Sequence, residues 1–402
     1  MTAVQQAPSD PAAYRPRGRR TRIACLVHGV GGRETGVRRL ILDQAAAWSD
    51  LDASIEVGLF VRCEAGTEDA WRDEPHVVAV RSSRLGIIGR FVARELLSVQ
   101  LARWRPDVIY LRHSTVSPSV VALAAIFPTV IGGDLDDLDE LKMRSPIRFW
   151  YARVSRNGLL RRARRIVVVT NELARHPAIV RLGRPVSVFP NSIDLARYPE
   201  LPAPANPSPH LVFIGSPGLV WSGVDKIGRL ALQFPSWRFD LVGPGPDELS
   251  GAPANVVIHG QLGREQYLPI MAQADVAIGP LALHRKGLSE ASALKVAEYL
   301  AYGIPVILGS PETAFPDGAP FLLQLPNSED NVDAATDEIR AFVERWRGRR
   351  VSRAAVSSID SAVVERERLL AILRAMRNPQ SSSAGPPPGG EARRSTRRSP
   401  LR

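Results

Sequence analysis

The stretch LSEASALKVAEYLAYGIPVILG, residues 288–309, joins a helical pattern to a short apolar strand. Its first part predicts a helix over 290–302, and the turn AYG ends that helix at a glycine. The run GIPVIL (303–308) then has the β-branched composition of a buried strand. A helix that leads directly into such a strand is one unit of a parallel α/β layer.

The same alternation of strands and helices extends upstream in two blocks. The nearer block has candidate strands at HLVFIG (210–215), WRFDLVG (237–243), NVVIHG (255–260) and DVAIGP (275–280), with helices predicted over 223–234 and 264–273. The farther block has candidate strands at RIACLVHG (22–29), SIEVGLFV (54–61), HVVAVR (76–81), DVIYLR (107–112), PTVIGG (128–133) and RRIVVVT (164–170), with a helix predicted over 89–104. The chain is therefore expected to be α/β, with two Rossmann-like sheets in tandem.

A proline-rich stretch at 197–210 separates the two blocks. We expect a disordered basic tail at 1–21, an N-terminal Rossmann-like domain at 22–200, a linker at 201–209, a C-terminal Rossmann-like domain at 210–350, a C-terminal helix at 351–377 and a second basic tail at 378–402. Helices predicted over 329–348 and 350–376 are expected to pack across the domains. Ligands of open α/β sheets bind at the carboxyl ends of the strands, so the cleft between the domains is the expected site.

Composition and charge exclude several classes of protein. The 402 residues are 45% hydrophobic and 23% charged, as in a soluble globular chain. The net charge is +11, but residues 1–22 and 378–402 each hold five Arg and one acidic residue, so the folded part is nearly neutral and specific nucleic-acid binding is disfavoured. The two cysteines, Cys25 and Cys63, match no metal or redox spacing, and no apolar run is long enough to span a membrane. A cytoplasmic protein is the simplest expectation.

Glu290 and Glu298 stand eight residues apart around the start of the predicted helix at 290–302. If both lie on one helix, they are separated by about 12 Å of rise and about 80° of rotation, so both carboxylates can face one groove. The amides from Ala291 to Leu294 would favour a phosphate between them. Two solvated carboxylates on a helix surface are the alternative.

These residues closely resemble the C-terminal domain of retaining GT-B glycosyltransferases that carry an E-x7-E motif. The resemblance continues through LVFIGSPGLVWSGVDKI (211–227), FDLVGPGP (239–246), NVVIHGQLGREQYLPIMAQADVAIGP (255–280) and PNSID (190–194), in the family's order. The glycine-rich HGVGGRETGVRRL (28–40) resembles the N-terminal loop of the same family more loosely. The resemblance implies the GT-B architecture, with two Rossmann-like domains that face a cleft.

The resemblance also implies roles for individual residues at the donor site. Glu290 would bind the hydroxyls of the donor sugar and act as a catalytic residue, while Glu298 would bind the ribose. The backbone of His259, Gly260 and Leu262 would contact the base. Gly31 and Gly32 would let the N-terminal loop approach the phosphates, although a plain flexible turn is the alternative for this pair.

The sequence departs from the family pattern where cations are expected to neutralise the diphosphate. Ser216 and Ser222 stand near the places where the family often has Arg and Lys. We expect Arg285 and Lys286 to replace these charges, with Lys295 as the second candidate. Solvated loop charge is the alternative for Arg285 and Lys286, in which case the chain would bind nucleotide sugars without turning them over.

The N-terminal block offers candidate residues for the acceptor side. His113 follows the strand DVIYLR directly and is a candidate catalytic residue, although a structural histidine is the alternative and Arg112 competes for the role. The acidic stretch DLDDLDEL (134–141), with Asp134, Asp136 and Asp137, is expected to border the acceptor site or to be a solvated loop. No metal site is predicted from these acids.

Residues 142–165 hold nine basic residues and no acidic one, interleaved with aromatic residues. This pattern is typical of a helix that docks on anionic lipid, and domain packing with an arginine-rich rim is the alternative. Peripheral contact with the inner face of a membrane would suit a polyprenyl-linked acceptor.

The sequence thus predicts a metal-independent glycosyltransferase of polysaccharide or cell-envelope synthesis, which moves a hexose-type sugar from a UDP- or GDP-sugar to a hydroxyl acceptor with retention. The acceptor would be a glycan or a lipid-linked glycan, and no cofactor is expected. Two alternatives stay open, a catalytically silent nucleotide-sugar-binding protein and a GT-B sugar-nucleotide epimerase.

Overall fold

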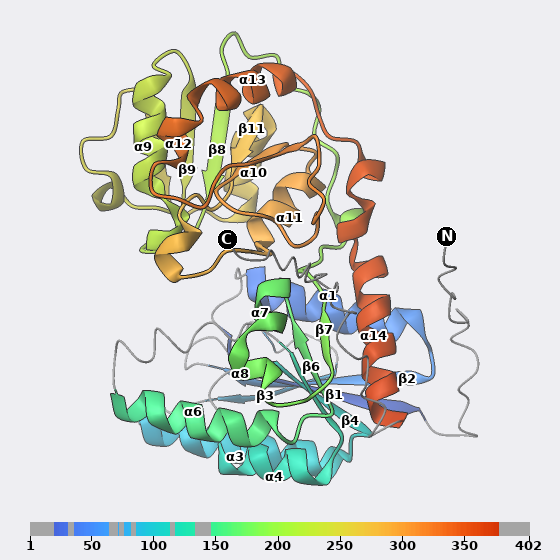
Figure 1. Ribbon diagram of the computed structural model, residues 1–402. Helices are drawn as coiled ribbons and strands as arrows, with labels where there is room; N and C mark the ends of the chain where they lie inside the picture. The colour runs from blue at the N-terminus through green and yellow to red at the C-terminus, as the bar shows by residue number, and fades with distance from the viewer. Residues whose placement is uncertain are drawn as a thin grey trace, which may run out of the picture.

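Two parallel β-sheets, each with helices on both faces, make up the structure (Figure 1). The computed structural model describes residues 20–30, 36–63, 71, 76–81, 86–112, 117–132 and 146–377. Both sheets have the same strand order, in which the first strand lies third and the chain runs outward on either side of it. This is the order of a Rossmann-like sheet, so the fold class predicted from sequence is confirmed.

The first sheet has the order β3-β2-β1-β4-β5-β6-β7, and every neighbouring pair is parallel. Its strands are β1 Thr21–Val30, β2 Ile55–Cys63, β3 Val77–Arg81, β4 Val108–Arg112, β5 Thr129–Gly132, β6 Arg165–Val168 and β7 Val186–Val188. The central strands are nearly continuous apolar runs because helices cover both of their faces.

Two helical layers enclose the first sheet. One layer contains α1 (Gly36–Leu51) and the C-terminal helix α14 (Ser361–Arg377), which share a core with β1, β2 and β4. The other contains α3 (Gly86–Trp104), α4 (Pro118–Ile126) and α6 (Pro146–Leu160), which lie on the side of the sheet away from the second sheet (Figure 1). Two short helices, α7 (Asn171–Arg175) and α8 (Pro177–Val180), follow β6.

The second sheet has the order β10-β9-β8-β11-β12-β13 and is also parallel. Its strands are β8 His210–Ile214, β9 Arg238–Val242, β10 Val256–Gly260, β11 Val276–Ile278, β12 Val306–Leu308 and β13 Leu322–Gln324. Helices α9 (Val224–Gln233), α12 (Asn331–Ala334) and α13 (Thr336–Trp346) pack on one face, and α10 (Arg264–Gln273) and α11 (Leu294–Ala301) pack on the other.

The chain passes between the sheets twice, and the two passages lie side by side. Ile193 forms a parallel bridge with Asp360, which closes the 3-10 helix η6 (Arg353–Ile359). After this bridge α14 returns to the first sheet and buries Leu369 and Ile372 there (Figure 1). Glu365 on α14 is fully buried and accepts hydrogen bonds from Gln44, Trp48, Ser192 and Arg368. The C-terminal helix is therefore an integral part of the first sheet's layer.

Three details of the predicted elements differ from the structure. The helix expected over 290–302 begins only at Leu294. The helix expected over 329–348 is divided into α12 and α13, and both pack on the second sheet, so only the last helix crosses to the other sheet. The three-residue strands β7 and β13 were not predicted. In the described ranges, no helix is long and apolar enough to cross a membrane.

Candidate functional site

The carboxyl ends of β8, β9 and β10 meet at glycines. Gly243 follows β9 with a φ of +103°, and its N–H donates to the carbonyl of Gly260 at 2.6 Å. A Cβ at Gly243 would lie 1.6 Å from the carbonyl oxygen of Gly215, which follows β8. Only glycine fits such a close approach. The loops at this edge, where ligands of open α/β sheets bind, are therefore tightly packed.

Lys295 on α11 points its ammonium group at this edge. The Nζ atom lies 4.2 Å from the ring centroid of Phe213 and 5.9 Å from that of Trp221. It is buried and has no hydrogen-bond partner among the described residues, and burial lowers the pKa of Lys295 to about 7. A buried ammonium without an anionic partner is costly to the fold, so its position points to a negatively charged ligand.

The Lys295 ammonium lies close to both places where the sequence lacks an expected cation. A Cβ at Gly215, the residue before Ser216, would be 3.1 Å from Nζ. The Nζ atom also faces the ring of Trp221, and Trp221 directly precedes Ser222. The second candidate of the sequence analysis thus lies next to the residues that precede both serines.

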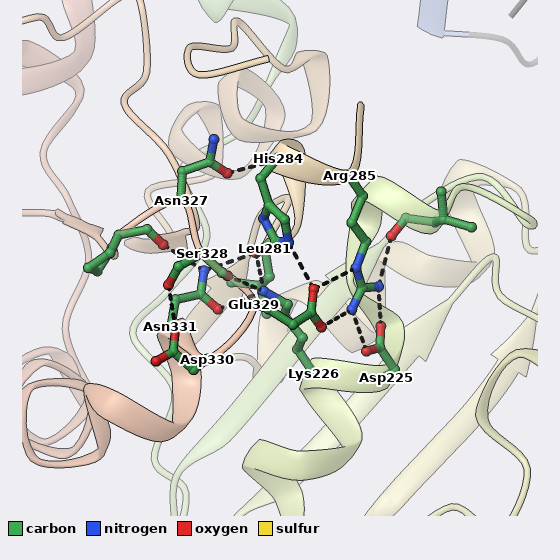
Figure 2. Close-up of polar contacts among 12 residues, drawn as sticks. Asp225, Lys226, Leu281, His284, Arg285, Asn327, Ser328, Glu329, Asp330 and Asn331 are labelled. Carbon is green, nitrogen blue, oxygen red and sulfur yellow. Dashed lines mark hydrogen bonds and ion pairs between the residues drawn. The ribbon is translucent and has the colours of Figure 1, made fainter. Parts of the chain in front are cut away.

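Arg285, the first candidate, is held instead in an ion-pair network (Figure 2). Its guanidinium donates to both oxygens of Asp225 at 2.7 Å, to both oxygens of Glu329 and to the carbonyl of Val220. These contacts use all five N–H groups, and they hold the pKa of Glu329 down to about 2. Arg285 has no donor left for a phosphate, which argues against the role expected for it. Lys286 lies 5.6 Å from the ring centroid of Trp221.

A second buried lysine supports the same loop. Lys226 on α9 is fully buried, and its Nζ donates to Asn331 and to the carbonyls of Leu281 and Ser328 (Figure 2). Together with Arg285 it fixes the 3-10 helix η5 (Leu283–Lys286) against α9 and α12. The network therefore positions the chain that leads to Glu290.

Glu290 is held by two residues of α7, in the first domain, and by Thr313 of the second domain. Its carboxylate accepts from Asn171 Nδ2 at 2.9 Å, from the Glu172 N–H at 2.8 Å and from Thr313 Oγ1 at 2.9 Å. Burial raises the pKa of Glu290, but these hydrogen bonds outweigh it and hold the pKa below its ordinary value.

The contact at Glu290 is reciprocal. The Glu172 carboxylate accepts from the N–H groups of Ser289 and Glu290 at 2.7 and 3.0 Å. Nearby, the Asn191 N–H donates to Ser292 Oγ at 2.8 Å. The Glu290 carboxylate, which is expected to bind the donor sugar, therefore lies where α7 of the first domain contacts the segment before α11 of the second domain.

The start of α11 differs from the geometry expected for a single helix. Ala291 lies in an extended segment that pairs with Glu312, and its N–H donates to the Pro311 carbonyl at 3.1 Å. The Ala293 N–H donates to Glu312 at 3.3 Å. Glu290 is consequently not on the helix of Glu298, and the rise and rotation calculated for one helix do not apply. Of the expected phosphate-binding amides, Leu294 begins the helix.

Glu298 has a separate set of partners. Its carboxylate accepts from the Tyr267 hydroxyl at 2.8 Å, on α10. Tyr302, at the end of α11, accepts from Arg264 at 2.9 Å, and the Arg264 guanidinium stacks 4.3 Å from the Tyr198 ring centroid. Arg39 on α1 reaches the Tyr198 hydroxyl at 3.1 Å. Glu298 thus adjoins aromatic residues and a cation from the opposite sheet.

The remaining predicted residues are placed as follows. His259 turns its side chain to Asp240 at 2.7 Å, while Gly260 ends β10 and Leu262 packs against the second sheet's core. Arg112 is the last residue of β4 and is half-buried. Gly31, Gly32, His113, Asp134, Asp136 and Asp137 lie outside the described residues. Within the described part of the chain, no cluster of His, Cys, Asp and Glu could hold a metal ion.

Sequence reasoning missed Asn171, Glu172, Thr313 and Glu312. Glu312 is buried beside Glu290, and burial raises its pKa to about 8. One available signal was that Asn171 and Glu172 follow the candidate strand RRIVVVT at its carboxyl end, where site residues of parallel sheets gather. No local pattern marks Thr313 or Glu312.

Comparison with known proteins identifies a family for the second half of the chain. Residues 209–344 match the family model described as glycosyl transferases, group 1. No curated protein sequence matches the chain at a significant level.

Solved structures share the whole architecture. The Anabaena protein HepE in complex with UDP and glucose is 17% identical, with a TM-score of 0.56 over 87% of this chain and 99% of that one. The pneumococcal O-GlcNAc transferase GtfA in complex with UDP and GlcNAc is 10% identical, with a TM-score of 0.60 over 90% and 100%. The UDP-GlcNAc 2-epimerase of Neisseria meningitidis bound to UDP-GlcNAc is 12% identical, with a TM-score of 0.54 over 88% and 100%. At these identities the similarity establishes the fold, which is GT-B.

Proposed function

We propose that the chain is a glycosyltransferase that moves a hexose-type sugar from a nucleoside diphosphate sugar to a hydroxyl acceptor, with retention and without a metal ion. The group 1 domain at 209–344 and the GT-B fold support the class of reaction. One observation carries the proposal for this chain: the buried, unpartnered ammonium of Lys295 beside Gly215. It offers positive charge where the diphosphate of a donor would lie.

In the proposed reaction the bond between the anomeric carbon and the diphosphate breaks while the acceptor oxygen bonds to that carbon. The acceptor proton passes to the departing diphosphate, so no enzymic nucleophile is required. Lys295 would stabilise the charge that develops on the leaving group. Glu290 would orient the sugar hydroxyls and Glu298 the ribose, since carboxylates accept from vicinal hydroxyls. A glycan or polyprenyl-linked glycan is the proposed acceptor, at the cytoplasmic side of the cell envelope.

Donor binding by this mechanism depends on pH in a defined direction. In the free protein Lys295 has a pKa of about 7, so it is half protonated at neutral pH. A bound diphosphate raises that pKa, because an opposite charge favours the ammonium form. Affinity for the nucleotide is therefore expected to be full below pH 7 and to fall as the pH rises above it.

Thermal unfolding with a panel of nucleoside diphosphates and their sugars tests the proposal. A ligand present at 100 times its dissociation constant stabilises the native state by about 2.7 kcal/mol. We expect one nucleotide to raise the melting temperature, with no effect of EDTA and with a weaker shift in Glu298→Ala. The shift should be lost in Lys295→Met and kept in Arg285→Gln, because the Arg285 guanidinium has no donor left for a phosphate. If no nucleotide stabilises the well-folded protein, the donor site is refuted.

The epimerase neighbour supports a second candidate function, because it shares the fold and binds UDP-GlcNAc. An epimerase would change the free nucleotide sugar without any acceptor. Incubation with the nucleotide sugar that stabilises the protein, followed by NMR of the sugar, separates the two activities. Release of nucleoside diphosphate only on addition of an acceptor supports transfer, inversion at a sugar carbon supports epimerisation, and neither reaction supports a silent binding protein.

A further inference from the structure

The helical layer of α3, α4 and α6 presents an apolar surface on the side of the first sheet away from the second sheet (Figure 1). Among the described residues, eight of the thirteen exposed large hydrophobic side chains lie on these three helices. Single exposed apolar residues are ordinary on protein surfaces, but such a concentration on one layer marks an interaction surface.

The exposed apolar residues of α3 follow the period of the helix. Ile88, Phe91, Val92, Leu96 and Val99 are between 45% and 68% exposed and form one stripe. The opposite stripe, with Ala93, Leu97 and Leu101, is buried on the sheet. A surface helix of a globular protein normally has polar residues on its outer side. The outer side of α3 is instead suited to burial.

The two neighbouring helices extend this surface. On α4, which lies between α3 and α6, the most outward large residue is Ile126, at 72% exposed, and no charged residue occurs along the helix. On α6, Trp150 and Val154 are four residues apart and are both more than 60% exposed. We call these residues, together with the stripe on α3, the outer apolar face.

Arginines outnumber acidic residues on these three helices. The sequence of the helices holds six Arg, of which Arg156 is buried, and one acidic residue, Glu95. One Glu95 oxygen is buried, whereas Arg90 and Arg103 are exposed. Exposed Arg161 and Arg162 follow the end of α6. Apolar and aromatic side chains flanked by arginines are the composition of helices that lie in the interface of an anionic membrane.

We propose that the outer apolar face docks the protein on an anionic lipid surface, with α3, α4 and α6 parallel to the membrane plane. Trp150 would lie at the headgroup level and the α3 stripe would enter the acyl boundary. The charges favour lipid over a second copy of the chain, because a symmetric contact through this face would bring two rows of arginines together. Docking does not depend on the proposed transferase activity, so either proposal can fail alone.

Vesicle flotation of the full chain tests docking. The vesicles are phosphatidylcholine alone and an equimolar mixture of phosphatidylcholine and phosphatidylglycerol. We expect binding to the mixed vesicles, and a decrease of at least about tenfold in the partition coefficient for the double variant Phe91→Ser, Leu96→Ser. The matched control is Leu232→Ser, Val363→Ser, which replaces two apolar residues elsewhere that are at least as exposed as Phe91 and Leu96. It should bind as the wild type does.

Two outcomes would overturn the proposal. Binding to the mixed vesicles that is unchanged in the Phe91→Ser, Leu96→Ser variant would assign the attraction to charge alone, for instance to the ten arginines in residues 1–22 and 378–402. A dimer by light scattering that this variant dissociates would assign the face to a second copy. The melting temperature of each variant shows that a loss of binding is not a loss of folding, since all four positions are exposed.

Discussion

Replacement of Lys295 by Met is expected to stabilise the protein while it removes nucleotide binding. Burial lowers the pKa of Lys295 from 10.5 to about 7. A decrease of about 3.5 in the pKa means that burial destabilises the ammonium form of Lys295 in the folded state by about 5 kcal/mol below pH 7. The residue as a whole is partly exposed, so solvent reduces this figure. We expect Lys295→Met to raise the free energy of unfolding by about 2 to 3 kcal/mol at pH 6.5, or about 5 °C in melting temperature.

The gain in stability expected for Lys295→Met decreases as the pH rises. Between pH 7 and 10.5 the unfolded wild-type chain binds more protons at Lys295 than the folded chain, so wild-type stability rises with pH through this window. The advantage of Lys295→Met is therefore full below pH 7 and disappears near pH 10.5. Thermal unfolding of both proteins at several pH values measures it, with and without the stabilising nucleotide.

Two results would refute this reasoning. If Lys295→Met melts below the wild type at pH 6.5, the buried ammonium has an anionic or hydrogen-bonded partner in the free protein. If the variant keeps the nucleotide-induced shift, the diphosphate is neutralised elsewhere. Arg285→Gln controls for the loss of one positive charge on the neighbouring loop, and it should keep the nucleotide-induced shift.

Three further substitutions test other parts of the structure. Arg285→Gln removes the partner of Asp225 and Glu329, so we expect a loss of about 1 to 2 kcal/mol with the nucleotide shift retained; a lost shift at unchanged stability would assign Arg285 to the donor. Glu365→Ala leaves buried Arg368 without its carboxylate, so urea unfolding should show a decrease of about 3 to 5 kcal/mol in the free energy of unfolding. A decrease below about 1 kcal/mol would contradict the conclusion that α14 is an integral part of the first sheet's layer. Burial raises the pKa of Glu312 from 4.5 to about 8, so the wild type loses stability as the pH rises through this window. Glu312→Gln should therefore match the wild type at pH 4.5 and exceed it at pH 8 in thermal unfolding, and equal pH profiles would count against a buried neutral carboxyl.

The sequence was sufficient to predict both sheets, because their central strands are apolar runs that are buried on both faces. It was insufficient for β7 and β13, since three residues are too few to show a period. The prediction for the start of α11 was wrong because residues outside the predicted helix pair with its first residues. Backbone hydrogen bonds join Ala291 to Pro311 and Thr313, which holds Ala291 extended and delays the helix to Leu294. Nothing local in residues 288–293 encodes that pairing.

The sequence indicated which residues would make up the candidate site, but it did not indicate which residues they contact. Glu290, Glu298 and Lys295 were identified from one short stretch of sequence. Two of the three partners of Glu290, by contrast, come from α7, which lies 118 and 119 residues earlier in the chain. Arg285 was ranked first because its loop precedes Glu290, but Asp225 and Glu329 lie 60 and 44 residues away and bind it completely. A sequence shows which charges exist, whereas only the fold shows which of them are already neutralised.

In the proposed donor site, that distinction would account for the missing cations at Ser216 and Ser222. Arg285 and Lys226 have carboxylate or carbonyl partners that satisfy them within the second sheet's layer. Lys295 has none, and its Nζ adjoins the residues that precede both serines. In the proposed donor site, a cation carried by α11 would take the place of a cation in the loop after β8. The free energy that the fold loses at this lysine would then be recovered when a diphosphate binds, so a gain in stability on its removal, together with loss of the nucleotide-induced shift, is the strongest test of the proposal.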